Sequence, residues 1–514
     1  MYTNTQVTFD ANPANARSES AISVNPRNPA NIVGASKKFT NPQTYEFTLA
    51  AYASFDGGTT WTESAPLGFQ PGWGGISDPT LAWDGAGNVY LVALPFPPGD
   101  APNQIGIAVY RSSDGGRTWS PPNLIHQSGG DDKQWAASDT SSGSPHHGNV
   151  YAVWDDVRDL AFARTTDNGT TWTGVAGQPA GSVLAGGSFG PQVSVGDDGT
   201  VYVAWVAGWT VHLVKSTNGG DSFSAPTVVA DAITPLTSPP LAAPNGFPEL
   251  PGGSFRVLSL GACTVGAGQT LAVAWADYRE GVSRLYGTYS HDGGASWLGG
   301  RSGQPLLTGA DASRGDQHDF HPQLSRGPDG SLGLAFYSFG PKWAGGPPLV
   351  DAFLATSTDS GAHFTRRQRV TNRACDPRVD APWSHGHSTT TFIGDYFGLA
   401  GSAAGWSVFW TDTRTGVQEM FYGREQRLGP WFGVQWTGEI PPHQTYDYFT
   451  FNWPAAWYVV WTPMVTTPQP GIQEISWKVR VERSTPYYLT YHIAITNLTG
   501  QAVGVEGRYA ILAM

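Results

Sequence analysis

An eight-residue motif, S/T-x-D/N-x-G-x-x-W/F, recurs along the chain and limits the folds available to it. Its six copies span residues 54–61, 112–119, 165–172, 216–223, 290–297 and 357–364. The copies are spaced at roughly 50 to 75 residues, which predicts a fold built from repeated units. Such a repeat constrains the scaffold more than the chemistry, because functional sites are placed on a fold by other residues.

Each copy reads as a tight turn between two strands. The Asp or Asn side chain accepts hydrogen bonds from nearby backbone amides, and the glycine takes the positive φ that such turns require. The aromatic residue three positions later begins the next strand and packs between sheets. All six copies are therefore interpreted as structural turns.

The motif resembles the Asp-box, or BNR repeat, of the sialidase-like β-propellers. The resemblance extends to about residue 425, and the fourth copy departs from it with Asn218 for Asp and Phe223 for Trp. It implies four-stranded blades with the box between the third and fourth strands, and a secreted, glycan-active protein.

Short alternating and apolar runs between the motifs indicate β-strands. The inner strand of the fifth unit is expected at 257–260, and a seventh unit at 394–424 lacks both the motif and a fourth strand. A lone strand at residues 4–9 can supply that strand, since an open ring leaves unpaired edges. We predict an all-β, seven-bladed propeller closed by the N-terminal strand; six blades, as in sialidases, is the alternative.

The sequence changes character after residue 428. Strand-like runs at 446–453, 457–461, 473–482, 488–497 and 503–512 alternate with prolines. We predict a propeller at 1–428 and a small antiparallel β-sandwich at 429–514. Its Trp and Tyr residues are interpreted as core and packing rather than as a sugar platform, and the domain could serve as an adaptor or oligomerisation module.

Composition excludes some partners. The net charge is −12 and no basic run occurs, so nucleic acid is not expected. No apolar stretch is long enough to span a membrane. The chain starts without a signal peptide, and its composition and the family resemblance favour an extracellular protein in mature form. Cys263 and Cys375 could pair, but buried free thiols are favoured.

A second motif, W-x-D-x-R, occurs at 154–158, 275–279 and 410–414. Strand alternation places these loops on the face of the ring opposite the boxes. We predict that Arg158, Arg279 and Arg414, with Asp277 and Asp412, bind an acidic sugar, because arginine pairs bidentately with carboxylates. The alternative is that each Asp and Arg pair within their own loop.

The segments that enter the first strands reach the same face. They carry Glu19, Asp78, Asp131, Asp132, Lys133, His318, Asp319, His321, Asp395 and Tyr396. Sialidases use a tyrosine nucleophile, so the resemblance implies this role for Tyr396 beside Asp395, with Asp78 or Asp132 as the acid. The family's Arg-Ile-Pro signature is absent; Arg17 stands in a different context.

The histidines and acid at His318, Asp319 and His321 suggest a divalent metal, although ordinary hydrogen-bonded histidines are favoured. No cofactor is required by the predicted chemistry, and calcium bound by loop oxygens is equally open. The predicted function is an exo-acting, sialidase-like glycoside hydrolase on acidic glycans. The alternative is a non-catalytic propeller that binds glycans or proteins.

Overall fold

The computed structural model describes residues 2–10, 15–99, 104–313, 315–341, 346–379, 383–384, 387–425, 431–455, 457–484 and 488–513. These residues form strands and short 3-10 turns and contain no α-helix. None of their helical segments has the length and apolar character that crossing a membrane demands. The chain divides into two compact units, Tyr2–Glu425 and a second that begins at Gln426.

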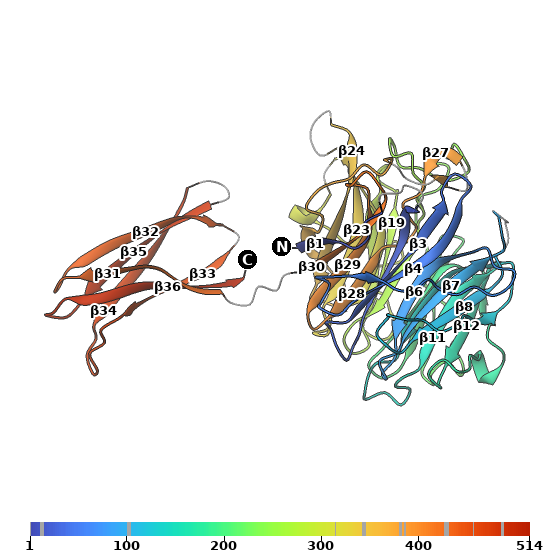
Figure 1. Ribbon diagram of the computed structural model, residues 1–514, viewed down its shortest axis with the longest axis horizontal. Coiled ribbons are helices and arrows are strands. Elements are labelled where there is room, and N and C mark those ends of the chain that lie inside the picture. The colour runs from blue at the N-terminus through green and yellow to red at the C-terminus, as the bar shows by residue number, and fades with distance from the viewer. Residues whose placement is uncertain are drawn as a thin grey trace. The chain divides into compact units, whose positions relative to one another are not determined.

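The described part of the first unit contains seven four-stranded antiparallel sheets. Figure 1 shows this unit as a body of β-strands. Six of them use consecutive strands: β2–β5 (Arg17–Val24, Ile32–Asn41, Glu46–Ser54, Thr62–Glu63), β6–β9 (Gly75–Trp83, Val89–Phe96, Ile107–Ser112, Asn123–His126), β10–β13 (Asp131–Ser138, Val150–Asp156, Asp159–Thr165, Ser182–Gly186), β14–β17 (Phe189–Val195, Val201–Ala207, Thr210–Ser216, Thr227–Ala230), β18–β21 (Ala262–Val265, Leu271–Asp277, Arg284–Ser290, Gln304–Pro305) and β22–β25 (His318–Arg326, Leu332–Pro341, Pro348–Ser357, Thr365–Arg369). A short hairpin, β26–β27 (Trp383–Ser384, His387–Thr391), precedes the last sheet.

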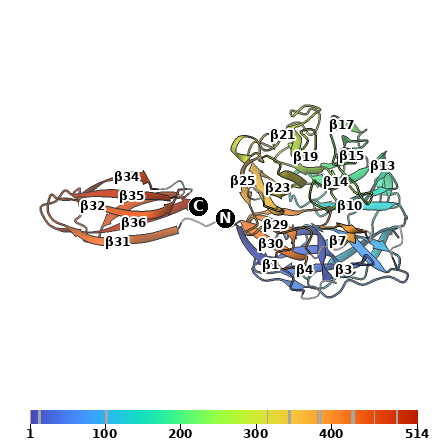
Figure 2. The ribbon, with the colours of Figure 1, turned by 90° about the horizontal axis from the view of Figure 1, so that it is seen from above.

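The last sheet joins both ends of the unit. Its order is β1 (Tyr2–Gln6), β30 (Glu419–Glu425), β29 (Gly405–Asp412) and β28 (Gly398–Ser402). β1 runs antiparallel to β30, from Tyr2 opposite Glu425 to Gln6 opposite Phe421, and the two lie side by side in Figure 2. The N-terminal strand therefore completes this sheet, as the sequence predicted, although it spans Tyr2–Gln6 rather than residues 4–9.

The first strands of the sheets surround a central cavity. Each contacts the first strand of the next sheet, in the order β2, β6, β10, β14, β18, β22 and β28, and β28 contacts β2 again. The cavity has a volume of about 250 Å³ and is lined by residues of all seven strands, including Ile22, Leu81, Trp135, Val193, Cys263, Leu324 and Leu399. The prediction of an all-β, propeller-like scaffold is confirmed.

Buried second strands hold the sheets against one another. They read as apolar runs because both faces are covered. Trp154, Trp275 and Trp410, the tryptophans of the W-x-D-x-R motifs, are among the largest fully buried side chains. Burying a large apolar side chain contributes about 1.5–3 kcal/mol, so these tryptophans belong to the core.

The repeated motif forms the expected turn. In the second copy Asp114 Oδ1 accepts hydrogen bonds from the backbone N–H groups of Arg117 and Thr118, both at 3.0 Å. Ser112 Oγ donates to Asp114 Oδ1 at 2.8 Å and accepts from Gly116 N–H at 2.9 Å. The equivalent contacts recur in the departing fourth copy, where Ser222 N–H donates to Asn218 Oδ1 at 3.0 Å.

One inner strand differs from the expectation. The first strand of the fifth sheet is β18 (Ala262–Val265), not residues 257–260. Those residues lie in a loop that side-chain hydrogen bonds hold in place: Ser259 Oγ donates to the carbonyl of Ala276 and accepts from Leu236 N–H. Cys263, in β18, and Cys375 are both buried free thiols.

The second unit consists of two three-stranded antiparallel sheets. Their orders are β31–β36–β33 (Trp431–Ile440, Val503–Ala513, Tyr458–Val465) and β32–β35–β34 (Thr445–Pro454, Tyr488–Asn497, Ile475–Arg483). The two sheets share one core, with Trp461 and Val505 from the first and Trp453 and Ile493 from the second. This accounts for much of the aromatic richness noted in the sequence.

Candidate functional site

A repeated irregularity at the start of the inner strands places side chains at one mouth of the ring. The pairing register shifts near the start of β2, β6, β10 and β22. At each shift one residue adopts a left-handed backbone: Glu19 (φ +56°), Asp78 (φ +54°), Lys133 (φ +54°) and His321 (φ +48°). Such conformations in non-glycine residues cost about 1–3 kcal/mol and cluster at functional sites.

Tyr396 and Asp78 form the centre of the cluster. The Tyr396 hydroxyl donates a hydrogen bond to Asp78 Oδ2 at 2.9 Å. Ser77 Oγ lies 2.7 Å from Asp78 Oδ1 and 3.0 Å from Glu19 Oε2. A single hydroxyl thus connects two carboxyl groups that come from different sheets.

Asp395 is held by two cations. Arg256 contacts both of its oxygens, Nη2 to Oδ2 at 2.6 Å and Nε to Oδ1 at 3.2 Å. Lys133 Nζ lies 2.9 Å from Asp395 Oδ2 and 3.7 Å from Asp78 Oδ2. Lys133 therefore bridges the Asp395 carboxylate and the carboxylate that accepts the tyrosine hydrogen bond.

Lys37 forms a second cationic contact beneath Glu19. Its ammonium lies 3.9 Å from Glu19 Oε2 and 3.3 Å from the Tyr45 hydroxyl. The rings of four buried aromatic residues surround it, the nearest being Phe47 with its centroid at 3.9 Å. Cation–π contacts gain strength in such a water-poor site.

The protonation states in the cluster differ from those in water. Burial, together with the nearby charge of Asp78, raises the pKa of Glu19 to about 8. Burial would also raise the pKa of Asp78, but the ammonium groups of Lys133 and Lys37 outweigh it and lower that pKa. Burial and the Asp78 charge hold the pKa of Tyr396 well above its usual range. At neutral pH the cluster therefore contains a protonated Glu19, an ionised Asp78 and a neutral Tyr396.

His321 lines a small cavity. The cavity has a volume of about 20 Å³ and its lining includes Lys133, Asp395 and Tyr396. Burial lowers the pKa of His321 to about 4, so its ring is neutral at pH 7. Neither ring nitrogen of His321 has a hydrogen-bond partner among the described residues.

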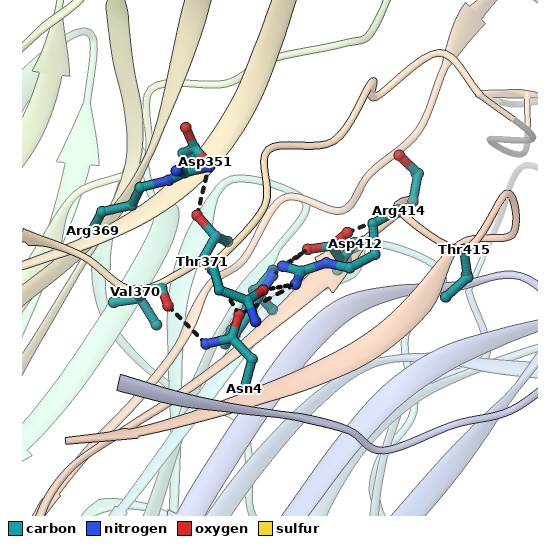
Figure 3. Close-up of polar contacts among 12 residues, drawn as sticks. Asn4, Asp351, Arg369, Val370, Thr371, Asp412, Arg414 and Thr415 are labelled. Carbon is teal, nitrogen blue, oxygen red and sulfur yellow. Dashed lines mark hydrogen bonds and ion pairs between the residues drawn. The ribbon is translucent and has the colours of Figure 1, made fainter. Parts of the chain in front are cut away.

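Two of the three predicted arginines form local ion pairs instead of converging on Tyr396. Arg279 Nε donates to Asp277 Oδ1 at 2.9 Å, and Arg414 Nη2 donates to Asp412 Oδ2 at 2.7 Å. Figure 3 shows Arg414 between Asp412 and Asn4. The indole N–H of Trp275 and that of Trp410 also donate to these aspartates. The expected three-arginine clamp is thus not assembled, because each aspartate holds the arginine two residues later.

Arg158 and Asp132 lie elsewhere on the same face. Arg158 is exposed and forms no ion pair within the described part of the chain. Asp132 accepts a hydrogen bond from the Lys133 backbone N–H at 2.8 Å, and burial raises its pKa. Both residues line a pocket of about 500 Å³ between the third and fourth sheets. Asp132 thus lies between this pocket and the Tyr396 cluster.

The predicted metal residues point to separate partners. His318 Nδ1 accepts from Ser283 N–H at 3.1 Å, and Asp319 pairs with Arg367 at 3.3 Å. In the described residues, the group of potential ligands that does come together is His126, Asp131 and Asp156. There His126 Nδ1 and Asp131 Oδ2 form a hydrogen bond of 2.8 Å, which supplies each with a partner.

Some members of the cluster carried no assigned role in the sequence. Lys37 lies on a second strand and Arg256 in the loop before β18, and neither belongs to a repeated motif. A signal does exist for the left-handed positions: Asp78-Pro79, Gly190-Pro191 and His321-Pro322 recur at the starts of inner strands. A residue before proline is disfavoured in the right-handed helical region, so this dipeptide marks the irregular strand start.

Fold and site together define an all-β scaffold with a buried tyrosine–carboxylate centre at one mouth. No family model and no curated protein matches the chain. Among solved structures, a leech intramolecular trans-sialidase in complex with 2,7-anhydro-Neu5Ac is similar, at 14% identity over 64% of this chain and 65% of its own, with a TM-score of 0.45. A protein of unknown function from Dyadobacter fermentans is 14% identical over 82% of this chain and 98% of its own, with a TM-score of 0.40. Trypanosoma rangeli sialidase in complex with the inhibitor DANA is 10% identical over 97% of this chain and 88% of its own, with a TM-score of 0.41.

Proposed function

We propose that the chain is a glycoside hydrolase of sialidase type, built on a seven-bladed propeller with a C-terminal β-sandwich. The observation that carries the proposal is the hydrogen bond from the Tyr396 hydroxyl to the Asp78 carboxylate, 2.9 Å long and set at the mouth of the ring. A nucleophile paired with a base in this way is the arrangement that covalent catalysis requires.

In the proposed reaction Tyr396 attacks the anomeric carbon while its proton passes to Asp78. The ionised state of Asp78, maintained by Lys133 and Lys37, makes it the base rather than the acid. Asp132 donates a proton to the leaving oxygen, because it borders the open pocket and its pKa is raised by burial. Water then cleaves the glycosyl–tyrosine bond, with Asp132 acting as base and Asp78 returning the proton to Tyr396.

Glu19 supports the base. Ser77 has one hydroxyl proton to donate and contacts both carboxyl groups. A protonated Glu19 can donate to Ser77 while Ser77 donates to Asp78, which satisfies all three groups in a buried site. Glu19 is thus a positioning residue that acts through Ser77.

An acidic sugar is the proposed substrate. A neutral phenol approaches an anomeric carbon that bears a carboxylate without the charge repulsion that a carboxylate nucleophile would meet. Lys133 and Arg256 pair with Asp395, the residue before the nucleophile, and add positive charge that this carboxylate balances in part. Sialosides are therefore the first substrates to test.

Replacing the nucleophile tests the proposal. Tyr396→Phe should lower kcat on a fluorogenic sialoside at least about a thousandfold, since the phenol oxygen that forms the covalent bond is removed. Tyr110→Phe is the matched control. Among the described residues the hydroxyl of Tyr110, in the second sheet, hydrogen-bonds to the carbonyl of Gly68 alone, so its loss should leave kcat unchanged. A folded wild-type protein without turnover on a panel of sialosides, furanosides and pyranosides refutes the hydrolase proposal.

A non-catalytic glycan-binding propeller is the second candidate. It is favoured by the pairing of Lys133 and Arg256 with Asp395, which leaves these cations partnered in the unliganded protein. Glycan binding without turnover, unchanged in Tyr396→Phe, selects this candidate.

A further inference from the structure

The pocket between the third and fourth sheets has walls made by two hairpin tips. Residues 157–158 connect β11 to β12, where Asp156 pairs with Asp159, and residues 208–209 connect β15 to β16, where Ala207 pairs with Thr210. The pocket volume of about 500 Å³ lies within the range of about 300–1,000 Å³ that is usual for small-molecule sites.

Both tips carry backbone strain at exposed apolar residues. Trp209 has φ +64° and follows Gly208 at φ +54°, a turn with two positive φ values in which Asn and Gly are the usual residues. Val157 has φ +60°, although a β-branched residue rarely adopts it. Trp209 remains 36% exposed and Val157 78% exposed. Burial does not offset the strain at Val157, and the exposed part of Trp209 lines the pocket.

The remaining lining suits a sugar ring. Phe189 packs edge-on against Trp209, with ring centroids 6.5 Å apart, and fixes the orientation of the indole. Arg158 is the arginine of the W-x-D-x-R set with no ion pair among the described residues. Asp155, beside it, accepts from the Gly190 backbone N–H at 2.9 Å. The aromatic face of the indole can stack on a pyranose ring. The guanidinium and the carboxyl groups of Asp132 and Asp155 can hydrogen-bond the hydroxyls of that ring.

We propose that this pocket binds the leaving-group sugar of the substrate, with Trp209 stacked on the ring and Arg158 bonded to its oxygens. The acidic sugar then binds at the Tyr396 cluster and the leaving-group sugar in the pocket. This assignment rests on the proposed function, because Asp132, the proposed acid, lines the pocket and adjoins Lys133 of the Tyr396 cluster. The glycosidic oxygen then lies between the pocket and the nucleophile.

Isothermal titration calorimetry tests this proposal by measuring the binding of 3′-sialyllactose, lactose and arabinobiose to the full chain. The chain carries Tyr396→Phe so that the glycans are bound but not hydrolysed. Trp209→Ala should weaken binding of 3′-sialyllactose or lactose about tenfold or more, and Trp209→Phe should restore most of it. Arg158→Ala should weaken it about fivefold. Arg279→Ala, from the same motif but locally paired, and Phe69→Ala, an exposed aromatic elsewhere, should leave binding unchanged.

Trp209→Gly separates binding from folding. Glycine accepts the left-handed backbone at position 209 without strain, which offsets part of the packing lost with the indole, so this variant should remain folded in a thermal melt and still lose binding. Binding that depends on Trp209 without wild-type turnover of any glycoside supports the pocket and rejects the hydrolase. Turnover or binding that is unaffected by Trp209→Ala and Trp209→Gly overturns the pocket and leaves the hydrolase standing. Absence of binding to all three glycans also overturns the pocket.

Discussion

Buried charge at single residues decides what the candidate site can do. Glu19 lies on β2, Asp78 on β6 and Asp395 in the segment before β28. Cations lie at different distances from the three carboxyl groups, so their pKa values diverge. Groups whose environments push their pKa values apart are suited to opposite roles in proton transfer. The left-handed backbone at Glu19 and Asp78 places these two side chains in the cluster.

The raised pKa of Glu19 predicts a pH dependence of stability. The pKa rises from 4.5 to about 8 on folding, so between these values the native state holds a proton that the unfolded state has lost. The free energy of unfolding contributed by Glu19 is therefore largest below pH 4.5 and falls as pH rises toward 8, by at most about 1.4 kcal/mol per pH unit. Glu19→Gln should flatten this fall in denaturant titrations at pH 5, 6, 7 and 8. An identical pH slope in both proteins contradicts the assignment.

The sequence predicted which residues lie at the candidate site better than it predicted their roles in catalysis. It placed Asp78, Asp132, Asp395 and Tyr396 on one face, and Asp78 and Tyr396 are in direct contact. It offered Asp78 or Asp132 as the acid, and the ammonium groups of Lys133 and Lys37, which keep Asp78 ionised, favour the second of these. That choice needs the distances between strands far apart in sequence, which periodicity alone does not provide.

At the level of secondary structure, the repeated turns stabilise the connection between the third and fourth strands of their sheets. Each has a serine or threonine hydroxyl that donates to the aspartate, or to Asn218 in the fourth copy, and accepts from a glycine N–H, as in Ser112. The sequence predicted these turns in detail because every contact lies within a few residues. It missed β31 (Trp431–Ile440), whose strand identity depends on pairing with the distant β36.

Asp114→Ala tests whether the repeated turn has a structural role. Loss of the carboxylate leaves the N–H groups of Arg117 and Thr118 without their partner, and should lower the free energy of unfolding by about 1–3 kcal/mol. Glycan binding and any turnover, per folded molecule, should stay unchanged. Asp114→Asn is the matched control, since Asn218 occupies this position in the fourth copy and keeps the acceptor oxygen. Reduced activity at an unchanged melting temperature contradicts a purely structural role.

The whole first unit depends on a sheet shared between its two ends. β1 covers the edge of β30, and Asn4 adds a side-chain hydrogen bond to the Val370 carbonyl of the neighbouring sheet, seen in Figure 3. Removing residues 1–10 should expose this edge and lower the melting temperature of the whole unit in a single calorimetric transition. Asn4→Ala, which keeps the strand, should have a much smaller effect. An unchanged melting profile after the truncation contradicts closure by β1.

The pairing of β1 with β30 also sets an order of events during synthesis. Tyr2 leaves the ribosome long before Glu425, its partner, has been made. β1 must therefore wait, without its partner strand, until the chain as far as β30 has emerged, and closing so long a loop is slow. Asn and Thr residues dominate this strand, Tyr2–Gln6; a polar strand is a weak partner for other exposed edges during that wait. The segment that completes the ring is thus suited to remaining soluble until its place exists.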